Sequence, residues 1–78
     1  MGELIAALAR MVVAEPAAVQ VATAREGGAT ILELRVAPAD VGRIIGRQGR
    51  TVRALRQVLA AAARDQESEY QLEIIEED

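Results

Sequence analysis

A break in a helical pattern is the feature that most constrains the fold of this chain. Two glycines, Gly46 and Gly49, stand between a short helical segment at 40–45 and a longer one at about 50–65. Glycine adopts positive φ angles at little steric cost, so this pair allows the chain to turn sharply where one helix would otherwise continue. The sequence therefore predicts two helices joined by a tight loop at 46–49.

The remaining residues supply one more helix and three strands. Apolar residues recur at helical spacing near the N-terminus, whereas three later segments alternate between apolar and polar residues. Gly27-Gly28 suits a tight hairpin turn, and a polar loop covers 65–69. The predicted elements are, in order, a helix over 3–14, strands over 19–25 and 30–37, helices over 40–45 and 50–65, and a strand over 70–75.

This order predicts an α+β fold. The first two strands form an antiparallel hairpin, and the last one returns after a helical crossover, so it should lie parallel to the second. The result is a three-stranded mixed sheet with three helices on one face. A chain of 78 residues is enough for one domain over 1–78, which ends in a solvated acidic tail at 76–78.

The predicted core is aliphatic and small in volume. The chain has no Phe or Trp, Tyr70 is its only aromatic residue, and Ala supplies 16 positions. Alternation places Ile31 and Ile75 on the outer face of the sheet, and Asp40 is expected to cap the helix that follows it. The expected inward stripes are Leu4, Ile5, Leu8, Met11 and Val12 in the first helix, and Val52, Leu55, Leu59 and Ala62 in the long one.

Charge is segregated along the chain. The net charge is −3, but the segment 41–64 holds six Arg and no acidic residue, while the rest of the chain holds three Arg and all twelve acidic residues. A basic segment on an acidic body is the electrostatic pattern to look for in a nucleic-acid-binding protein.

Several classes of function are disfavoured. The chain has neither Cys nor His, which removes most metal ligands and the commonest general base, so we expect no metal and no cofactor. Ser68 is the only Ser, and a nucleotide-binding P-loop would require Gly at position 44 and Lys at position 50. These absences argue against catalysis, so we expect a protein that is not an enzyme. No apolar run is long enough to cross a membrane, so we expect a cytoplasmic protein.

The loop at 46–49 is the candidate site. Backbone amides at the start of a helix are unpaired and carry partial positive charge, and Arg47 and Arg50 add full charges beside them. Ile44, Ile45 and Val52 would flank the loop with an aliphatic surface. Taken alone, such a loop is more often an ordinary turn, and such arginines are more often a solvated helix face.

The segment from Ile44 to Val52, Ile-Ile-Gly-Arg-Gln-Gly-Arg-Thr-Val, resembles the I-G-x-x-G-x-x-I/V signature of KH domains. The order of elements resembles the bacterial type II version, and the length and layout resemble the single-domain KH RNA-binding proteins of the KhpA family. This resemblance covers nearly the whole chain.

The resemblance implies a function as well as a fold. The loop would clamp the backbone of about four nucleotides of single-stranded RNA. The opposite wall, near 66–70, is acidic here, a departure that favours a one-sided grip. The family is also linked to RNA-chaperone action, to control of cell-wall growth and cell shape, and to pairing as a homodimer or with a second RNA-binding protein of the KhpB type. The implied RNA-binding residues are Arg43, Ile44, Ile45, Gly46, Arg47, Gln48, Gly49, Arg50, Val52 and Arg53.

A rival hypothesis is that the chain is a protein-interaction module with a KH fold and little RNA binding. Its support is the acidic balance and the outward position expected for Ile31 and Ile75, which are as easily ordinary exposed aliphatic residues.

Overall fold

The computed structural model describes residues 1–76, so the last two residues of the expected acidic tail lie outside the described part. The order of elements is the predicted one, and every bound except the end of the first helix lies within two residues of its expected position. The elements are α1 Gly2–Arg10, β1 Gln20–Glu26, β2 Ala29–Arg35, α2 Val41–Ile45, α3 Arg50–Ala63 and β3 Glu69–Ile74, with short 3-10 turns at Pro16–Ala18, Pro38–Asp40 and Arg47–Gly49.

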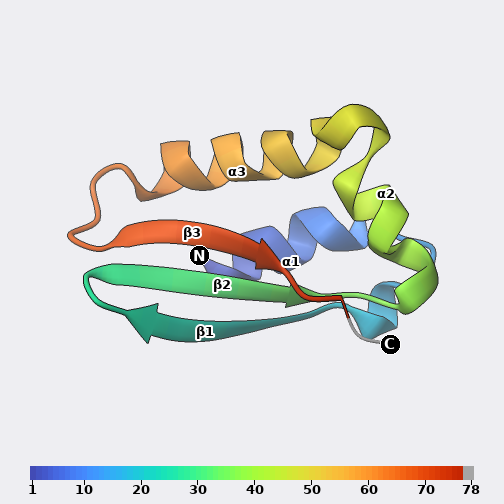
Figure 1. The fold of residues 1–78 in the computed structure, drawn as a ribbon, viewed down its shortest axis with the longest axis horizontal. Coiled ribbons are helices and arrows are strands. Elements are labelled where there is room, and N and C mark those ends of the chain that lie inside the picture. The colour runs from blue at the N-terminus through green and yellow to red at the C-terminus, as the bar shows by residue number, and fades with distance from the viewer. Residues whose placement is uncertain (77–78) are drawn as a thin grey trace.

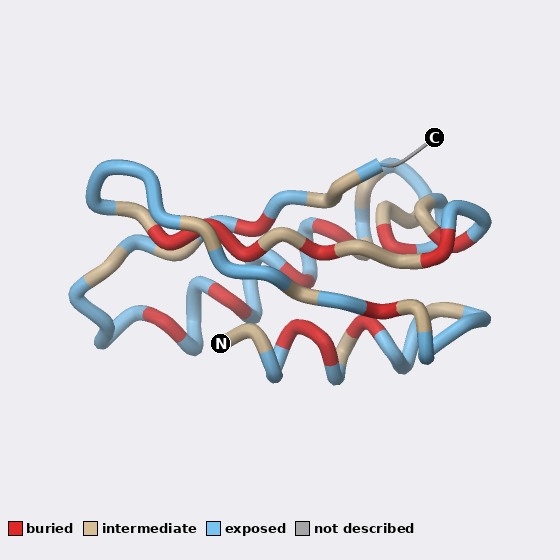
Figure 2. The backbone as a smooth tube through the Cα atoms, turned by 90° about the horizontal axis from the view of Figure 1, so that it is seen from below, coloured by how far each residue is buried: buried red, intermediate tan, exposed pale blue. Residues whose placement is uncertain are grey.

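The sheet is mixed, as the sequence predicts. Its strand order is β1-β2-β3, with β1 antiparallel to β2 and β2 parallel to β3. The helices lie on one face, where α1 and α3 cover the sheet and α2 sits at its end (Figures 1 and 2). This is the expected α+β arrangement of two layers. Because β2 is central, β3 is an edge strand, and its free edge lies beside α3.

The buried face of α1 differs from the predicted stripe. Ile5, Ala6 and Ala9 are buried and Leu8 is half-buried, whereas the expected Leu4, Met11 and Val12 are exposed, Met11 to 82%. The small side chains of Ala6 and Ala9 allow the helix to lie close to the sheet, which rotates the larger residues outward. The helix also ends at Arg10, so Met11 no longer follows the helical spacing that placed it inward.

The long helix α3 packs almost as expected. Val52, Leu55 and Leu59 are buried against the sheet, but the last buried position is Ala63 and the predicted Ala62 is exposed. Ala62 and Ala63 lie three and four residues beyond Leu59, and both spacings are close to one helical turn. In this helix the residue four positions on, Ala63, faces the sheet.

The outer face of the sheet also corrects an expectation. Ile31 is only 5% exposed although it points away from the helices. It lies on the central strand, opposite Ala24 on one side and Gln71 on the other, so neighbouring strands shield it from both sides. Ile75 is half-buried. Ile31 therefore does not offer the exposed apolar surface that the rival hypothesis invoked.

Within residues 1–76, no helix is both long enough and apolar enough to cross a membrane.

Candidate nucleic-acid interface

The helical break occurs where the sequence places it. α2 ends at Ile45, and Gly46 leaves the helix with φ 75° and ψ 170°. Gly49 has φ 74°, and α3 begins at the next residue. Two backbone bonds close the turn: the Gly46 N–H donates to the Gly42 carbonyl at 2.8 Å and the Gly49 N–H donates to the Gly46 carbonyl at 3.1 Å. The corner at 46–49 is therefore a defined structure and not a continuation of one helix.

The two glycines are required for different reasons. A Cβ atom on Gly46 would collide with the Thr51 side chain and would lie 2.8 Å from the Thr51 backbone nitrogen. Its φ and ψ also fall in a region that is essentially restricted to glycine. At Gly49 a Cβ atom would meet only a Val52 methyl group at 4.0 Å, so only the positive φ favours glycine there.

Gln48 adopts a conformation that is uncommon for its residue type. Its φ of 57° and ψ of 26° are left-handed, and it is the only residue other than glycine with positive φ among residues 1–76. Its side chain is exposed, so no packing interaction compensates the backbone energy. Strain held at an exposed loop is typical of positions that are kept for function.

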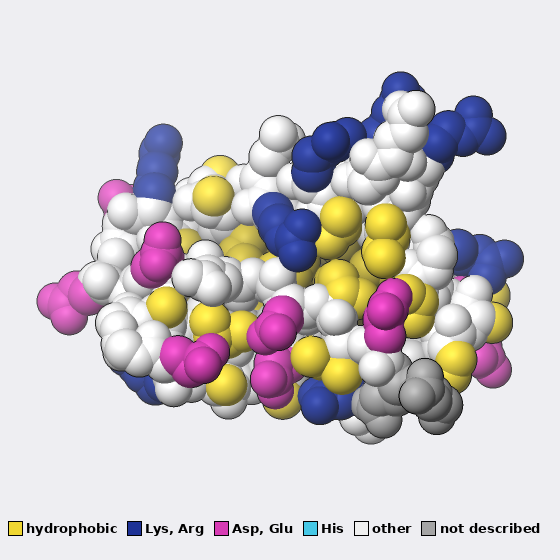
Figure 3. Space-filling model, in the orientation of Figure 1, with side chains coloured by type: hydrophobic (Ala, Val, Ile, Leu, Met, Phe, Trp, Pro, Cys, Tyr) yellow, Lys and Arg dark blue, Asp and Glu magenta, His cyan; other side chains and the backbone are white. Residues whose placement is uncertain are grey.

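Arginine side chains surround this corner. Arg47, Arg50 and Arg53 are exposed, and no side chain within residues 1–76 caps the N-terminus of α3. Figure 3 shows basic groups gathered over α3 and the loop before it, carboxylates over the strands, and hydrophobic side chains in the hollow between them. An anion at this rim would meet guanidinium groups together with the positive end of the α3 dipole.

The three aliphatic residues expected to line the site differ in their exposure. Ile44 is fully buried in the core, so it supports the loop from beneath and offers no surface to a ligand. Val52 is nearly buried, and Ile45 is half-buried. The aliphatic surface open to a ligand is therefore supplied mainly by Ile45, with a small contribution from Val52.

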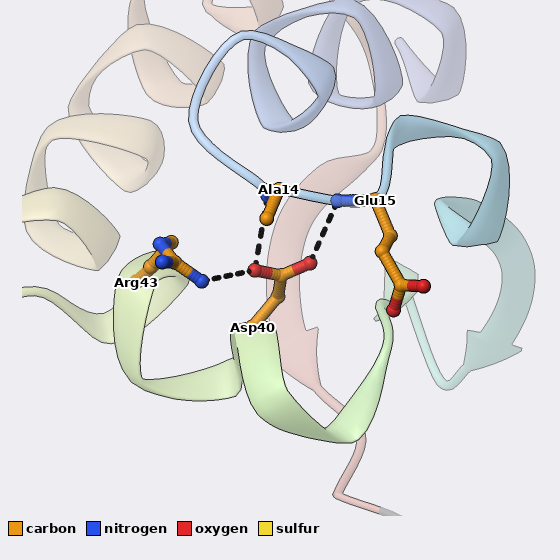
Figure 4. Close-up of polar contacts among 4 residues, drawn as sticks. All are labelled: Ala14, Glu15, Asp40 and Arg43. Carbon is orange, nitrogen blue, oxygen red and sulfur yellow. Dashed lines mark hydrogen bonds and ion pairs between the residues drawn. The ribbon is translucent and has the colours of Figure 1, made fainter.

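Asp40 has a role that the sequence did not reveal. It precedes α2, but its carboxylate makes no capping bond to that helix. Instead, the backbone N–H groups of Ala14 and Glu15 each donate to one of its oxygens at 3.0 Å, and Arg43 Nη1 donates to Oδ1 at 2.8 Å (Figure 4). Asp40 is only 1% exposed. This carboxylate therefore fastens the start of α2 to the chain that follows α1.

These contacts determine the electrostatics of Asp40 and Arg43. The hydrogen bond from the Ala14 N–H, followed by those from Glu15 and Arg43, holds the pKa of Asp40 below its ordinary value of 3.8, although burial opposes the shift. Arg43, expected to contact RNA, is half-exposed but already paired with this carboxylate. Its charge is partly neutralised, unlike the charges at the α3 rim.

The opposite wall of the hollow is formed by β3 and the loop before it. Ser68 anchors this loop, because its hydroxyl lies 2.7 Å from Thr30 Oγ1 and donates to the Gly28 carbonyl at 3.2 Å. The loop carries exposed carboxylates at Asp65 and Glu67, as the sequence indicated. Glu69, also expected there, and Glu73 alternate along β3 with the core-facing Tyr70, Leu72 and Ile74, so they lie on the outer face of the sheet.

Arg56 was not among the expected site residues, yet it lies between the two walls. Its Nη2 donates to the Leu72 carbonyl on the free edge of β3 at 3.1 Å. The helical spacing of Val52 and Arg56 was the available signal, since residues four apart share one face of a helix.

We predict that the two glycines respond differently to substitution. Gly46→Ala should lower the free energy of unfolding by about 2 kcal/mol or more, because strained dihedral angles and a collision with Thr51 add together. Gly49→Ala should cost about 1–2 kcal/mol, for the positive φ alone. Urea unfolding followed by circular dichroism measures both. Equal losses would contradict this account of the corner.

We also predict that Asp40 makes folding sensitive to acid. A carboxyl group with a lowered native pKa stabilises the fold at pH values above its unfolded pKa and loses that effect as the pH falls through the native pKa. The urea midpoint of Asp40→Asn should therefore lie below that of the wild type at pH 7, and the gap should close as the pH falls below 3.8. Other carboxyl groups titrate in both proteins and cancel in this difference. A gap that is independent of pH would overturn the assignment.

Comparison with known proteins agrees with this geometry. The family model described as KhpA/KhpB, KH domain matches residues 2–74. The chain is 49% identical over 74 residues to the RNA-binding protein KhpA of Treponema pallidum, an alignment that covers 95% of this chain and 92% of the relative. It is 41% identical over 75 residues to the RNA-binding protein KhpA of Caldanaerobacter subterraneus subsp. tengcongensis, covering 96% of this chain and all of the relative.

A more distant relative matches over the same extent. The RNA-binding protein KhpA of Chlamydia trachomatis serovar D is 36% identical over 77 residues, covering 99% of each chain. No solved structure matches the chain significantly. The family is not one of enzymes, in agreement with the expectation from the sequence. The family model spans nearly all of the sequence, and the corner at 46–49 lies within it: the chain belongs to the KhpA/KhpB KH-domain family.

Proposed function

We propose that this chain binds single-stranded RNA at the corner 46–49 and in the hollow between α3 and β3, with low overall sequence selectivity. The observation that carries the proposal is the strained, exposed corner at an uncapped helix N-terminus, rimmed by arginines. Relatives over nearly the full length are named RNA-binding proteins, which supports the same function.

Polar groups of the corner and of α3 would contact the phosphates, and aliphatic side chains would contact the bases. The backbone amides of Arg47 and Gln48 and the guanidinium groups of Arg47, Arg50 and Arg53 would hold phosphates of about four nucleotides, because the Gly46 and Gly49 amides already donate to backbone carbonyls. Ile45, with a small contribution from the largely buried Val52, would support the bases. Arg43 would contribute less than the others, because Asp40 already engages it.

The expected affinity is modest. Only one wall is basic, and the loop before β3 carries the exposed carboxylates Asp65 and Glu67, so a Kd on the order of micromolar is expected for one domain. If about three phosphates are neutralised, log affinity should fall with log salt with a slope of about −2. A protein-interaction module, the alternative function, would give no RNA binding to titrate.

Useful affinity would then require two linked sites, and we propose that the chain forms a homodimer. An apolar groove of about 240 Å³ lies between α1 and α3, where Met11 and Val58 are exposed to 82% and 40%. A two-fold dimer pairs the same patch of both subunits, so the patch must be complementary to itself. Met11 supplies a projection beside this groove, which is lined by Leu8, Met11, Val12, Thr51, Ala54, Leu55 and Val58.

A role as an RNA chaperone or post-transcriptional regulator follows from weak, weakly selective binding by paired domains. Such a protein contacts many RNAs briefly and acts through assembly with a partner, either a second copy or a second RNA-binding protein of the KhpB type. A link to cell-wall growth and cell shape would be the physiological consequence that the family resemblance implies.

We predict that Arg47→Asp combined with Gln48→Asp reduces RNA affinity at least tenfold, because two carboxylates would face the phosphates. Folding should change by less than about 0.5 kcal/mol, since both side chains are exposed and Asp tolerates the left-handed conformation of position 48. Fluorescence anisotropy with a labelled hexauridylate measures the affinity, and urea unfolding measures the stability.

The control for this variant is Arg25→Asp combined with Gln20→Asp. It makes the same change in charge at exposed positions of β1, away from the corner. It should lower affinity much less. Equal losses of affinity in the two double variants would mean that net charge, and not the corner, governs binding. Unchanged affinity in the Arg47/Gln48 variant would mean that RNA does not bind at the corner.

We predict that Val58→Glu converts the chain to a monomer, because a buried charge would replace an apolar contact at the dimer interface. Sedimentation velocity over a range of concentrations should give a dimer for the wild type and a monomer for this variant. Gln20→Glu adds the same charge on β1 and should remain dimeric.

A wild type that is monomeric at every concentration would overturn the homodimer. If Val58→Glu instead abolished binding to a second RNA-binding protein, the groove would belong to a heterodimer.

A further inference from the structure

Arg56 lines the hollow, and only one nitrogen of its guanidinium group donates a hydrogen bond within residues 1–76. It projects from α3 toward the free edge of β3, where Nη2 donates to the Leu72 carbonyl at 3.1 Å. A guanidinium group has five N–H donors in a rigid plane, and this bond holds one edge of the group at β3 although the side chain is exposed. The remaining donors have no acceptor within residues 1–76 and are available to a ligand.

The space beside Arg56 is suited to a flat, partly polar ring. A hollow of about 370 Å³ is lined by Arg56, Leu59, Tyr70, Gln71 and Leu72. Tyr70 is the only aromatic residue of the chain, and it is half-buried against the core. Aromatic and aliphatic side chains at the side of the hollow, with polar groups at its edge, are typical of small-molecule and base-binding sites.

This hollow is distinct in chemistry from the corner at 46–49. Arg56 lies seven residues beyond Gly49 on a helix that rises about 1.5 Å per residue, so it is roughly 10 Å further along α3. The phosphate-binding groups of the proposed function cluster at the corner, whereas this hollow sets one cation beside Tyr70, the polar Gln71 and the edges of the largely buried Leu59 and Leu72. Its occupant is therefore expected to be a base and not a phosphate.

We propose that this hollow takes one base of the bound RNA and that Arg56 makes the position selective for guanine. The inference rests on the proposed function and adds one selective position to an otherwise weakly selective site. Guanine presents two acceptors, O6 and N7, side by side, and the guanidinium fork matches them with two parallel hydrogen bonds. Adenine has the same ring size but offers an amino donor in place of O6, which would face a donor of Arg56.

The test compares affinities of one folded protein for matched RNAs. Hexauridylate, the same hexamer with one central guanosine, and the same hexamer with one central adenosine are measured by fluorescence anisotropy. The guanosine hexamer should bind about tenfold more tightly than the adenosine hexamer. Replacing guanosine with 7-deazaguanosine removes the N7 acceptor and should abolish most of this preference.

Arg56→Lys identifies the residue responsible. Lysine keeps the charge and can still donate to the Leu72 carbonyl, but it has no planar fork, so the preference for guanosine should fall to about twofold or less. Because the preference is a ratio measured on one protein, a loss of stability does not create or remove it. Arg53→Gln, one turn earlier on the exposed side of α3, should lower affinity for all the hexamers and keep the ratio.

The outcomes separate this inference from the proposed function. Binding of every hexamer without a preference for guanosine, or an equal preference in Arg56→Lys, would overturn the role of Arg56 and leave RNA binding intact. No binding of any hexamer would overturn both.

Discussion

The backbone conformation of Gly46 is the constraint on which the rest of the structure depends. With φ 75° and ψ 170°, this residue ends α2, and Thr51 occupies the space that a side chain would need. The same turn starts α3 at Arg50, with its first amides uncapped by any side chain within residues 1–76. One local dihedral choice therefore separates two helices and creates the exposed corner at which an anion could bind.

Opposite charges lie on the two sides of the hollow. A single uninterrupted segment supplies the arginines over α3, while the carboxylates come from β3 and the loop before it. The proposed binding mode, with phosphates at the corner and bases toward the sheet, is consistent with this separation of charge. The net charge of −3 is compatible with RNA binding because the two signs are separated in space.

Asp40 supports this arrangement from outside the hollow. A carboxylate beside a basic segment would ordinarily compete with an anionic ligand, but two backbone amides and Arg43 satisfy it at a position that is almost fully buried. It links the segment after α1 to the start of α2, and so connects the first helix to the helix that leads into the corner at 46–49. The same contact pairs Arg43 with a carboxylate, so its charge is partly neutralised.

The sequence by itself determined the order of elements, the mixed sheet and the break at 46–49, because these follow from local rules: periodicity, glycine dihedral angles and the geometry of a crossover. Tertiary structure alone decided which face of α1 is buried, the shielding of Ile31 and the partners of Asp40. Each of these depends on groups far apart in the chain. Packing places Ala6 and Ala9 of α1 against the core and leaves Met11, just beyond the end of the helix, exposed. Only the packed structure brings Ala14 to Asp40 or Arg56 to Leu72.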